Sequence, residues 1–243
     1  MSTLGVAVLL ATLFTAWTPN SLFAGNLQDQ LRYMLTPQAG PSTSSSPQPQ
    51  LRIGLVAGHA GNDSGAVCYD NNGAVDITEA DVNLKIASLV RDSLVAQGYQ
   101  VDLLNEFDTR LNGYRAVALV SIHNDSCEYV NDEATGYKVA ASLETRDVNR
   151  AQRLIGCLID RYHQSTGMTF HAASITADMT EYHAFSEIDP NTITAIIETG
   201  FLNLDREILT EHTDQVAEGV TQGILCFVNN ETILPTPFPT FAP

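Results

Sequence analysis

The chain lacks the sequence signatures of several common binding proteins. It has no Cys-x-x-Cys pair, which argues against a cysteine zinc site, and no Gly-x-Gly-x-x-Gly fingerprint, which argues against a dinucleotide site. Basic residues are scarce, because 12 stand against 28 acidic residues and the formal net charge is −16. A field of that sign repels phosphate backbones, so we expect no nucleic-acid partner.

No long apolar run occurs after the N-terminus, and the run at residues 5–17 is too short to span a bilayer comfortably. It resembles the apolar core of a secretory signal, and a small-residue cleavage site would follow Ala24. No Lys or Arg precedes Arg32, so an uncleaved signal anchor is the alternative. We predict that residues 1–24 are a signal peptide or a signal anchor, and that the protein is exported. Only the anchor would give it contact with a membrane.

The composition divides the remaining chain into three parts. Residues 25–50 are rich in Pro, Ser and Gln and predict a flexible linker, and the Pro-rich residues 231–243 predict a disordered tail. Residues 51–230 have the length of one ordinary domain. We therefore expect a single catalytic or binding domain between two unstructured ends.

Strand and helix patterns alternate within that domain. Short apolar runs at 52–58, 99–104, 115–122 and 194–199 predict strands, and residues 137–142 predict a weaker one. Apolar residues at helical spacing predict helices over 79–97, 147–163 and 213–228. Alternation of this kind indicates an α/β fold, with a mostly parallel twisted sheet and helices on both faces.

Four cysteines occur in the sequence, and an even number in an exported chain favours disulfides. Cys68 follows the loop that contains His59, and Cys127 follows His123. Cys157 and Cys226 each lie in a helical pattern. Of the three pairings that four cysteines allow, we favour Cys68–Cys127 and Cys157–Cys226. Four separate buried thiols are the alternative.

Four polar residues, of types that bind metals or transfer protons, stand in or beside apolar, strand-like runs. His59 and His123 each follow a predicted strand, so both should lie at the carboxyl edge of the sheet, where ligands bind in α/β folds. Glu79 opens a predicted helix, and Glu198 interrupts the apolar run AIIETGFL. Two histidines and a carboxylate can hold Zn²⁺ with one position left for water, and a further carboxylate can move a proton. The sequence therefore indicates a zinc hydrolase.

Each of these residues also has an ordinary structural interpretation. His59 beside glycines can be a simple loop histidine, and Glu79 can be an acid in the first helical turn, which the helix dipole favours. Asp76 and Asp81 lie close to Glu79 in the sequence and are rival ligands. Glu198 can belong to a structural ion pair, although the chain offers few bases for one.

Taken in order, the four segments resemble the zinc-dependent N-acetylmuramoyl-L-alanine amidases of the third type, which are bacterial cell-wall hydrolases. The family loop Gly-His-Gly-Gly-x-Asp-x-Gly-Ala corresponds to residues 58–66, GHAGNDSGA. A glutamate at the head of a helix corresponds to Glu79, Ser-Ile-His-x-Asn to residues 121–125, and Glu-x-Gly-Phe-Leu to residues 198–202. The resemblance covers roughly residues 52–228, and four ordered motifs are more specific than any one of them.

The resemblance implies that His59, Glu79 and His123 bind zinc and that Glu198 is the catalytic acid and base. It implies a peptidoglycan substrate, cut between N-acetylmuramic acid and L-alanine, and a periplasmic, wall-associated or extracellular location. A zinc peptidase acting on stem peptides, and a non-catalytic wall-binding module, are the alternatives. A protein regulator is left open.

The chain departs from the family pattern at three places. Ala60 replaces a glycine of the first loop, and residues 107–114 are shorter than the family's Arg-containing helix. His171 and His183 have no counterpart in the motifs. We interpret His183 as a loop histidine, with a place along the active-site cleft as the alternative.

Overall fold

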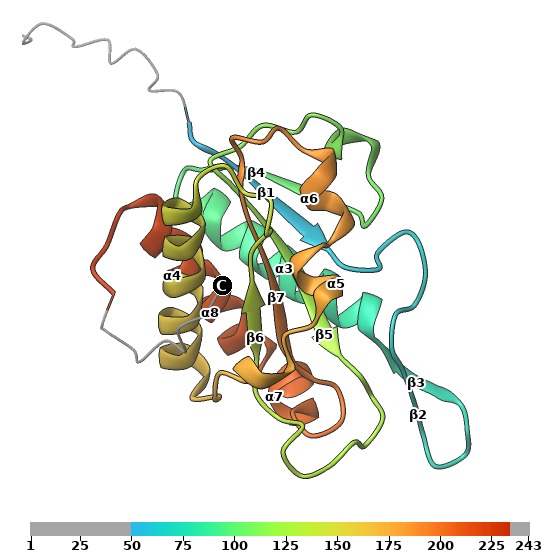
Figure 1. Cartoon of the computed structure of the whole chain (residues 1–243). Coiled ribbons are helices and arrows are strands. Elements are labelled where there is room, and N and C mark those ends of the chain that lie inside the picture. Colours follow the sequence, from blue (N-terminus) through green and yellow to red (C-terminus); the bar gives the residue numbers. More distant parts are fainter. Residues whose placement is uncertain (1–49, 234–243) are drawn as a thin grey trace, which may run out of the picture. The chain divides into compact units, whose positions relative to one another are not determined.

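A five-stranded sheet forms the centre of residues 50–233, the part of the chain that the computed structural model describes (Figure 1). The strand order is β4-β1-β5-β7-β6; the first four strands are mutually parallel, and β6 is antiparallel to β7. This arrangement confirms the predicted α/β class and the mostly parallel sheet. The strands are β1 (Arg52–Ala57), β4 (Gln100–Leu104), β5 (Ala118–Asp125), β6 (Lys138–Ala140) and β7 (Ile193–Phe201).

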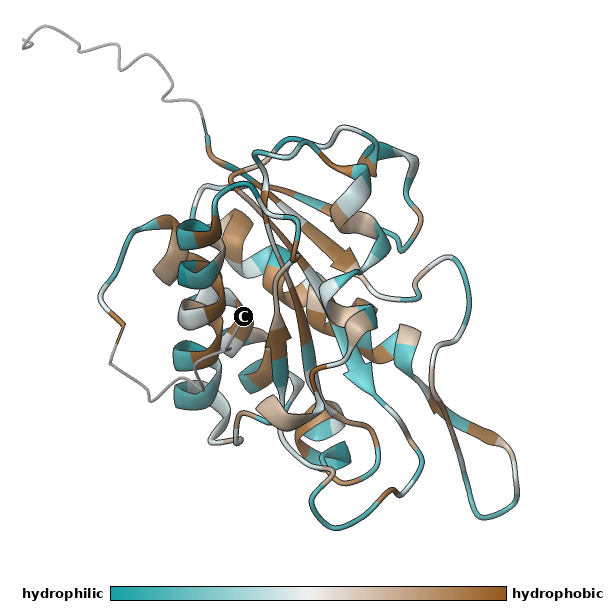
Figure 2. Cartoon of the chain, viewed as in Figure 1, coloured by the Kyte–Doolittle hydropathy of each residue, from teal (hydrophilic) through white to brown (hydrophobic). Residues whose placement is uncertain are grey.

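Three long helices cover one face of the sheet, namely α3 (Glu79–Ala96), α4 (Val148–Thr166) and α8 (Thr213–Val228). Alternate strand residues point toward them, because side chains alternate between the two faces of a strand. Ile53, Leu55 and Ala57 of β1 all belong to this main core and are fully buried. In Figure 2 the strands are largely brown, whereas the outer side of α4 is teal.

The opposite face has a thinner cover. Val56, Leu119 and Ile196 point to this side and pack in a second core with Tyr182. Two short helices, α5 (Ala177–Thr180) and α6 (His183–Glu187), lie over them. Helices on both faces are therefore confirmed, but the three long helices share one face and the short ones cover the other.

Several elements are present that the sequence pattern did not predict. A hairpin of β2 (Val67–Tyr69) and β3 (Val75–Thr78) precedes α3 and projects beyond the sheet in Figure 1. The short helix α7 (Arg206–Glu211) follows β7, and two 3₁₀ turns lie at Thr109–Leu111 and Ala172–Ser174. Among residues 50–233, no helix has the length and apolar character needed to cross a membrane.

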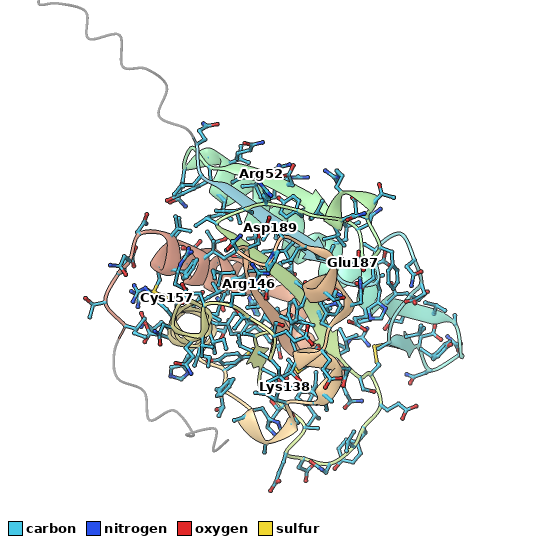
Figure 3. All side chains as sticks on the ribbon, turned by 45° about the horizontal axis from the view of Figure 1, so that its top comes forward. Arg52, Lys138, Arg146, Cys157, Glu187 and Asp189 are labelled. Carbon is cyan, nitrogen blue, oxygen red and sulfur yellow. A yellow bond between two sulfur atoms is a disulfide. The ribbon has the colours of Figure 1, made fainter. Side chains whose placement is uncertain are left out.

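Both predicted disulfides are confirmed. Cys68 and Cys127 have Cα atoms 5.4 Å apart, and their bridge joins β2 to the loop after β5. Cys157 and Cys226 have Cα atoms 5.6 Å apart and link α4 to α8; Cys157 is labelled in Figure 3. One bridge therefore lies near the carboxyl edge of the sheet, and the other lies within the helix layer. The predicted signal segment (1–24), the linker up to residue 49 and the tail from residue 234 fall outside the described residues.

Candidate metal centre

His59 lies just beyond β1, in a turn whose backbone is unusual for a histidine. Its φ angle is +63°, in the left-handed region that most residues avoid. The backbone N–H of His59 donates to Oε2 of Glu106 at 2.8 Å, which helps to hold this conformation. On the ring, Nδ1 lies 2.6 Å from Oδ1 of Asp63, so Nε2 is directed to the other side. The loop therefore fixes the orientation of the imidazole.

His123 and Glu198 come from adjacent strands and occupy paired positions in the register of β5 and β7. Their neighbours Ile122 and Ile197 point into the main core, so alternation directs both polar side chains to the opposite face. The ring of His123 also lies against Gly58, where any Cβ atom would overlap it. The close approach of the His123 ring to the first loop therefore depends on glycine at this position.

Glu79 is the first residue of α3, as predicted. Thr78 precedes it, and the Thr78 hydroxyl accepts the N–H of Asp81, which caps the helix. The side chain of Glu79 is buried rather than solvated, with an exposed fraction of 5%. Its Oε2 also accepts the N–H of Ala66 at 3.0 Å. The interpretation of Glu79 as a simple first-turn acid therefore does not describe its position.

The rival ligands lie elsewhere. Asp76 is in β3 and forms an ion pair with Arg206, and the Asp81 carboxylate accepts the Thr78 hydroxyl at 2.7 Å. Neither residue lines the cleft that contains His59 and His123.

Three ligand-type side chains meet at the carboxyl edge of the sheet. Nε2 of His59 is 3.3 Å from Oε2 of Glu79, and Nδ1 of His123 is 3.2 Å from Oε1 of the same carboxylate. One ligand atom from each residue lies within 4.8 Å of the others, and this is the one such group of three among residues 50–233. Two imidazoles and one carboxylate form a donor set that suits Zn²⁺, and the side that faces the cleft leaves room for water.

A cleft of about 470 Å³ lies beside this group, and Glu198 lines it too. Oε2 of Glu198 is buried and has no hydrogen-bond partner among the described residues. Burial raises the pKa of the Glu198 carboxyl to about 7, although the charges of His123 and Lys138 oppose the rise. Lys138, labelled in Figure 3, pairs with Asp125 and sits opposite Glu198 in the sheet register. A carboxyl with a pKa near neutrality can both accept and return a proton.

Two residues of the candidate metal group also have shifted pKa values. Burial would raise the pKa of Glu79, but the hydrogen bonds from His123 and Ala66 outweigh it, so that pKa is lowered. Burial would lower the pKa of His123, but the hydrogen bond to Glu79 and the charges of Glu198 and Glu106 raise it overall. The carboxylates around His123 therefore favour positive charge at its ring.

His183 differs from the interpretation given to it from sequence. It opens α6 and lines the cleft, so the expectation of an ordinary loop histidine was wrong. Its Nε2 lies 2.9 Å from Oε1 of Glu106, and its ring stacks on Phe107 with a centroid distance of 4.3 Å. His171 is not part of the cleft: its Nδ1 lies 2.5 Å from Oγ of Ser174.

Glu106 is a residue of the site that the sequence pattern did not indicate. It follows β4 in a loop, with no motif around it, and yet its exposed fraction is only 6%. Burial would raise its pKa, but the hydrogen bond from His183, the charge of His123 and the N–H of His59 lower it to about 2. Its signal in the sequence is weak, since a single acid after a strand is most often solvated.

Comparison with known proteins agrees with this geometry. The family model described as N-acetylmuramoyl-L-alanine amidase matches residues 53–226. Among solved structures, the chain is similar to the CwlD amidase of Clostridioides difficile, solved in complex with the GerS lipoprotein, with 20% identity, a TM-score of 0.58, and 75% of this chain and 100% of that chain covered.

The amidase AmiC2 of Nostoc punctiforme is similar at 23% identity and a TM-score of 0.54, with 74% of this chain and 97% of that chain covered. Ami1 of Mycobacterium smegmatis has 16% identity and a TM-score of 0.56, with 74% and 98% covered. No curated protein matches the chain at the same level of significance. At these identities the structures support the fold, and the family match spans most of the sequence. The chain belongs to the N-acetylmuramoyl-L-alanine amidase family.

Proposed function

We propose that this protein is a zinc-dependent hydrolase that cuts the amide bond between N-acetylmuramic acid and L-alanine in peptidoglycan. His59, Glu79 and His123 would hold the zinc ion. The observation that carries the proposal is the meeting of these three ligands, with atoms within 4.8 Å of one another, beside a cleft that also contains Glu198. Membership of the amidase family is the reason for proposing the bond between N-acetylmuramic acid and L-alanine.

When bound, zinc acts as a Lewis acid that lowers the pKa of water to about 7 and polarises a carbonyl oxygen. The chain's own residues supply the proton transfers. Glu198 takes a proton from the attacking water and returns it to the leaving nitrogen of L-alanine. Its place on a central strand holds the carboxylate still, and its buried Oε2 has no other partner among residues 50–233.

We also propose that the protein acts outside the cytoplasm, in the periplasm, in the wall or extracellularly. The two disulfides support this, because such bonds persist mainly in oxidising compartments. Peptidoglycan, the proposed substrate, is found in the same locations. A membrane attachment would require that residues 1–24 be retained.

Digestion of purified peptidoglycan, followed by mass analysis of the released fragments, tests the choice of bond. The proposal predicts free stem peptides that begin with L-alanine, together with glycan strands that carry unsubstituted lactyl groups. Release of shorter peptides, with L-alanine still attached to muramic acid, would identify a peptidase instead. Binding to the wall without any release would indicate a non-catalytic module.

A further inference from the structure

Each histidine of the candidate metal group has a carboxylate beside the ring nitrogen that faces away from Glu79. His59 directs Nε2 toward Glu79, and its other nitrogen, Nδ1, lies 2.6 Å from Oδ1 of Asp63. Asp63 is in turn held by the N–H of Gly65 at 2.8 Å. A carboxylate in this position fixes the tautomer of a metal-binding histidine and makes it a better ligand.

His123 also has a carboxylate beside its outer nitrogen, but at a longer distance than the one beside His59. Its Nδ1 lies 3.2 Å from Oε1 of Glu79, so this nitrogen faces the metal group. Its Nε2 is buried and lacks a hydrogen-bond partner among the described residues. The carboxylate opposite Nε2 is that of Glu106, whose Oε2 is 3.6 Å away. A small approach of the two groups would complete a hydrogen bond.

We propose that Glu106 is a positioning residue for the zinc site: it accepts the Nε2 proton of His123 and so keeps Nδ1 available to the metal. This inference rests on the proposed function, since it assumes that His123 binds zinc. It assigns to Glu106 the role for His123 that Asp63 has for His59.

Glu106 is well fixed for this role. Its Oε2 accepts the backbone N–H of His59 at 2.8 Å, so one carboxylate contacts both metal-binding histidines. Its Oε1 accepts the hydroxyl of Tyr182 at 2.9 Å and lies 2.9 Å from Nε2 of His183. Tyr182 and His183 belong to the segment that forms one wall of the cleft. Glu106 therefore joins the cleft wall to the metal site.

The alternative is that Glu106 only anchors that wall. Glu187 provides a matched comparison, because its Oε1 lies 2.8 Å from Nδ1 of the same His183 (Glu187 is labelled in Figure 3). Glu187 contacts the wall but does not line the cleft, and no bond joins it to His59 or His123 among the described residues. Loss of either carboxylate would weaken the hold on His183, but only loss of Glu106 would affect His123.

The test measures the zinc dissociation constant of the full chain by competition with a chelator. Glu106→Gln should weaken zinc binding about 10- to 100-fold, the usual cost of losing such a partner, whereas Glu187→Gln should leave it within about 3-fold of the original protein. Equal affinities for the original and Glu106→Gln proteins, or equal losses in both variants, would overturn the role of Glu106. If the unsubstituted protein binds no zinc, the proposed metal site fails as well, and the two failures are thus distinguished.

A second measurement applies even if Glu106→Gln does not fold. Long-range ¹H–¹⁵N spectra of the zinc-loaded, unsubstituted protein report which ring nitrogen of each histidine carries the proton. The inference predicts that the proton of His123 is on Nε2 and that of His59 on Nδ1. A proton on Nδ1 of His123 would contradict it, because Nδ1 could then not bind the metal.

Discussion

The carboxyl edge of the sheet and the helix layer on its main face are built from opposite kinds of residue. At the edge, His123, Glu79 and Glu106 are nearly buried, with exposed fractions of 7%, 5% and 6%. In the helix layer, fully buried Leu, Ile and Val side chains surround the Cys157–Cys226 bridge. The same strands contribute to both regions. Their side chains that point toward the long helices are apolar, whereas those at the carboxyl ends are charged or titratable.

We infer from this contrast that the apolar helix layer stabilises the fold and that the polar edge carries the chemistry. Apolar burial stabilises the fold at roughly 25 cal/mol per Å². Burial of carboxylates costs free energy unless each one is paired. Within residues 50–233, two buried atoms at the edge have no hydrogen-bond partner, namely Oε2 of Glu198 and Nε2 of His123. We therefore expect changes at the edge to affect metal binding and activity, and changes in the helix layer to affect the free energy of unfolding.

The largest effect should come from removing a ligand. His59→Ala should abolish both zinc binding and amide hydrolysis, because two remaining ligands seldom hold zinc in a catalytic site. Zinc content by atomic spectrometry and product release from peptidoglycan check this. Asp81→Asn is the control, since Asp81 was a rival ligand by sequence; it should keep zinc and activity. If Asp81→Asn lost zinc while His59→Ala kept it, Asp81 and not His59 would be the ligand.

The two disulfides should differ in what their removal changes. Replacing Cys157 and Cys226 with Ala should lower the free energy of unfolding by roughly 4 kcal/mol, given the 69-residue separation that this bridge closes, and leave zinc affinity unchanged. Replacing Cys68 and Cys127 should also destabilise the fold, and in addition weaken zinc binding, because that bridge ties the segment before α3 to the loop after β5. Denaturant unfolding and zinc titration of both double variants measure this. Equal zinc affinity in the two variants would remove the distinction.

A smaller effect concerns the pH dependence of the metal-free protein. The pKa of Glu198 is about 7 in the folded state, against an ordinary 4.5, so between these values only the folded state keeps the proton. The contribution of Glu198 to stability is therefore full below the ordinary value and is lost as the pH rises through about 7. We compare the chelator-treated original protein with Glu198→Gln. Between about pH 5 and about pH 8, the unfolding free energy of the original protein should fall by about 1–3 kcal/mol more than that of the variant. Denaturant unfolding at several pH values measures this, and parallel curves for the two proteins would contradict it.

Much of the sheet was predictable because its strands are strongly apolar and its long helices have clear periodicity. The final helix over residues 213–228 has the predicted bounds, and Glu79 begins α3 as expected. The hairpin before α3 was not predicted, because β2 and β3 have only 3 and 4 residues, and most of them are not buried. The weak strand predicted at 137–142 shortens to the three residues of β6.

The site was only partly predictable. His59 and His123 stand out because each follows an apolar strand, Glu198 because it interrupts one, and Glu79 because it opens a helix in the order of the family motifs. The structure brings all four to one cleft. Glu106 gave no such signal, since its importance comes from long-range contacts with residues 47 and 76 positions away in the chain. The position of His183 in the cleft could not be predicted either, because it depends on its contact with Glu106. Contacts of this kind are set by the tertiary fold and not by local sequence.

The most direct test of the account is the Glu198→Gln protein, assayed for zinc content and for peptidoglycan hydrolysis in the same preparation. Glutamine keeps the shape of the side chain but cannot accept the proton. The account predicts full zinc occupancy and a rate of amide hydrolysis at least about 10²-fold lower, the low end for losing a general acid and base. Near-normal turnover with zinc bound would contradict it and remove Glu198 from the mechanism.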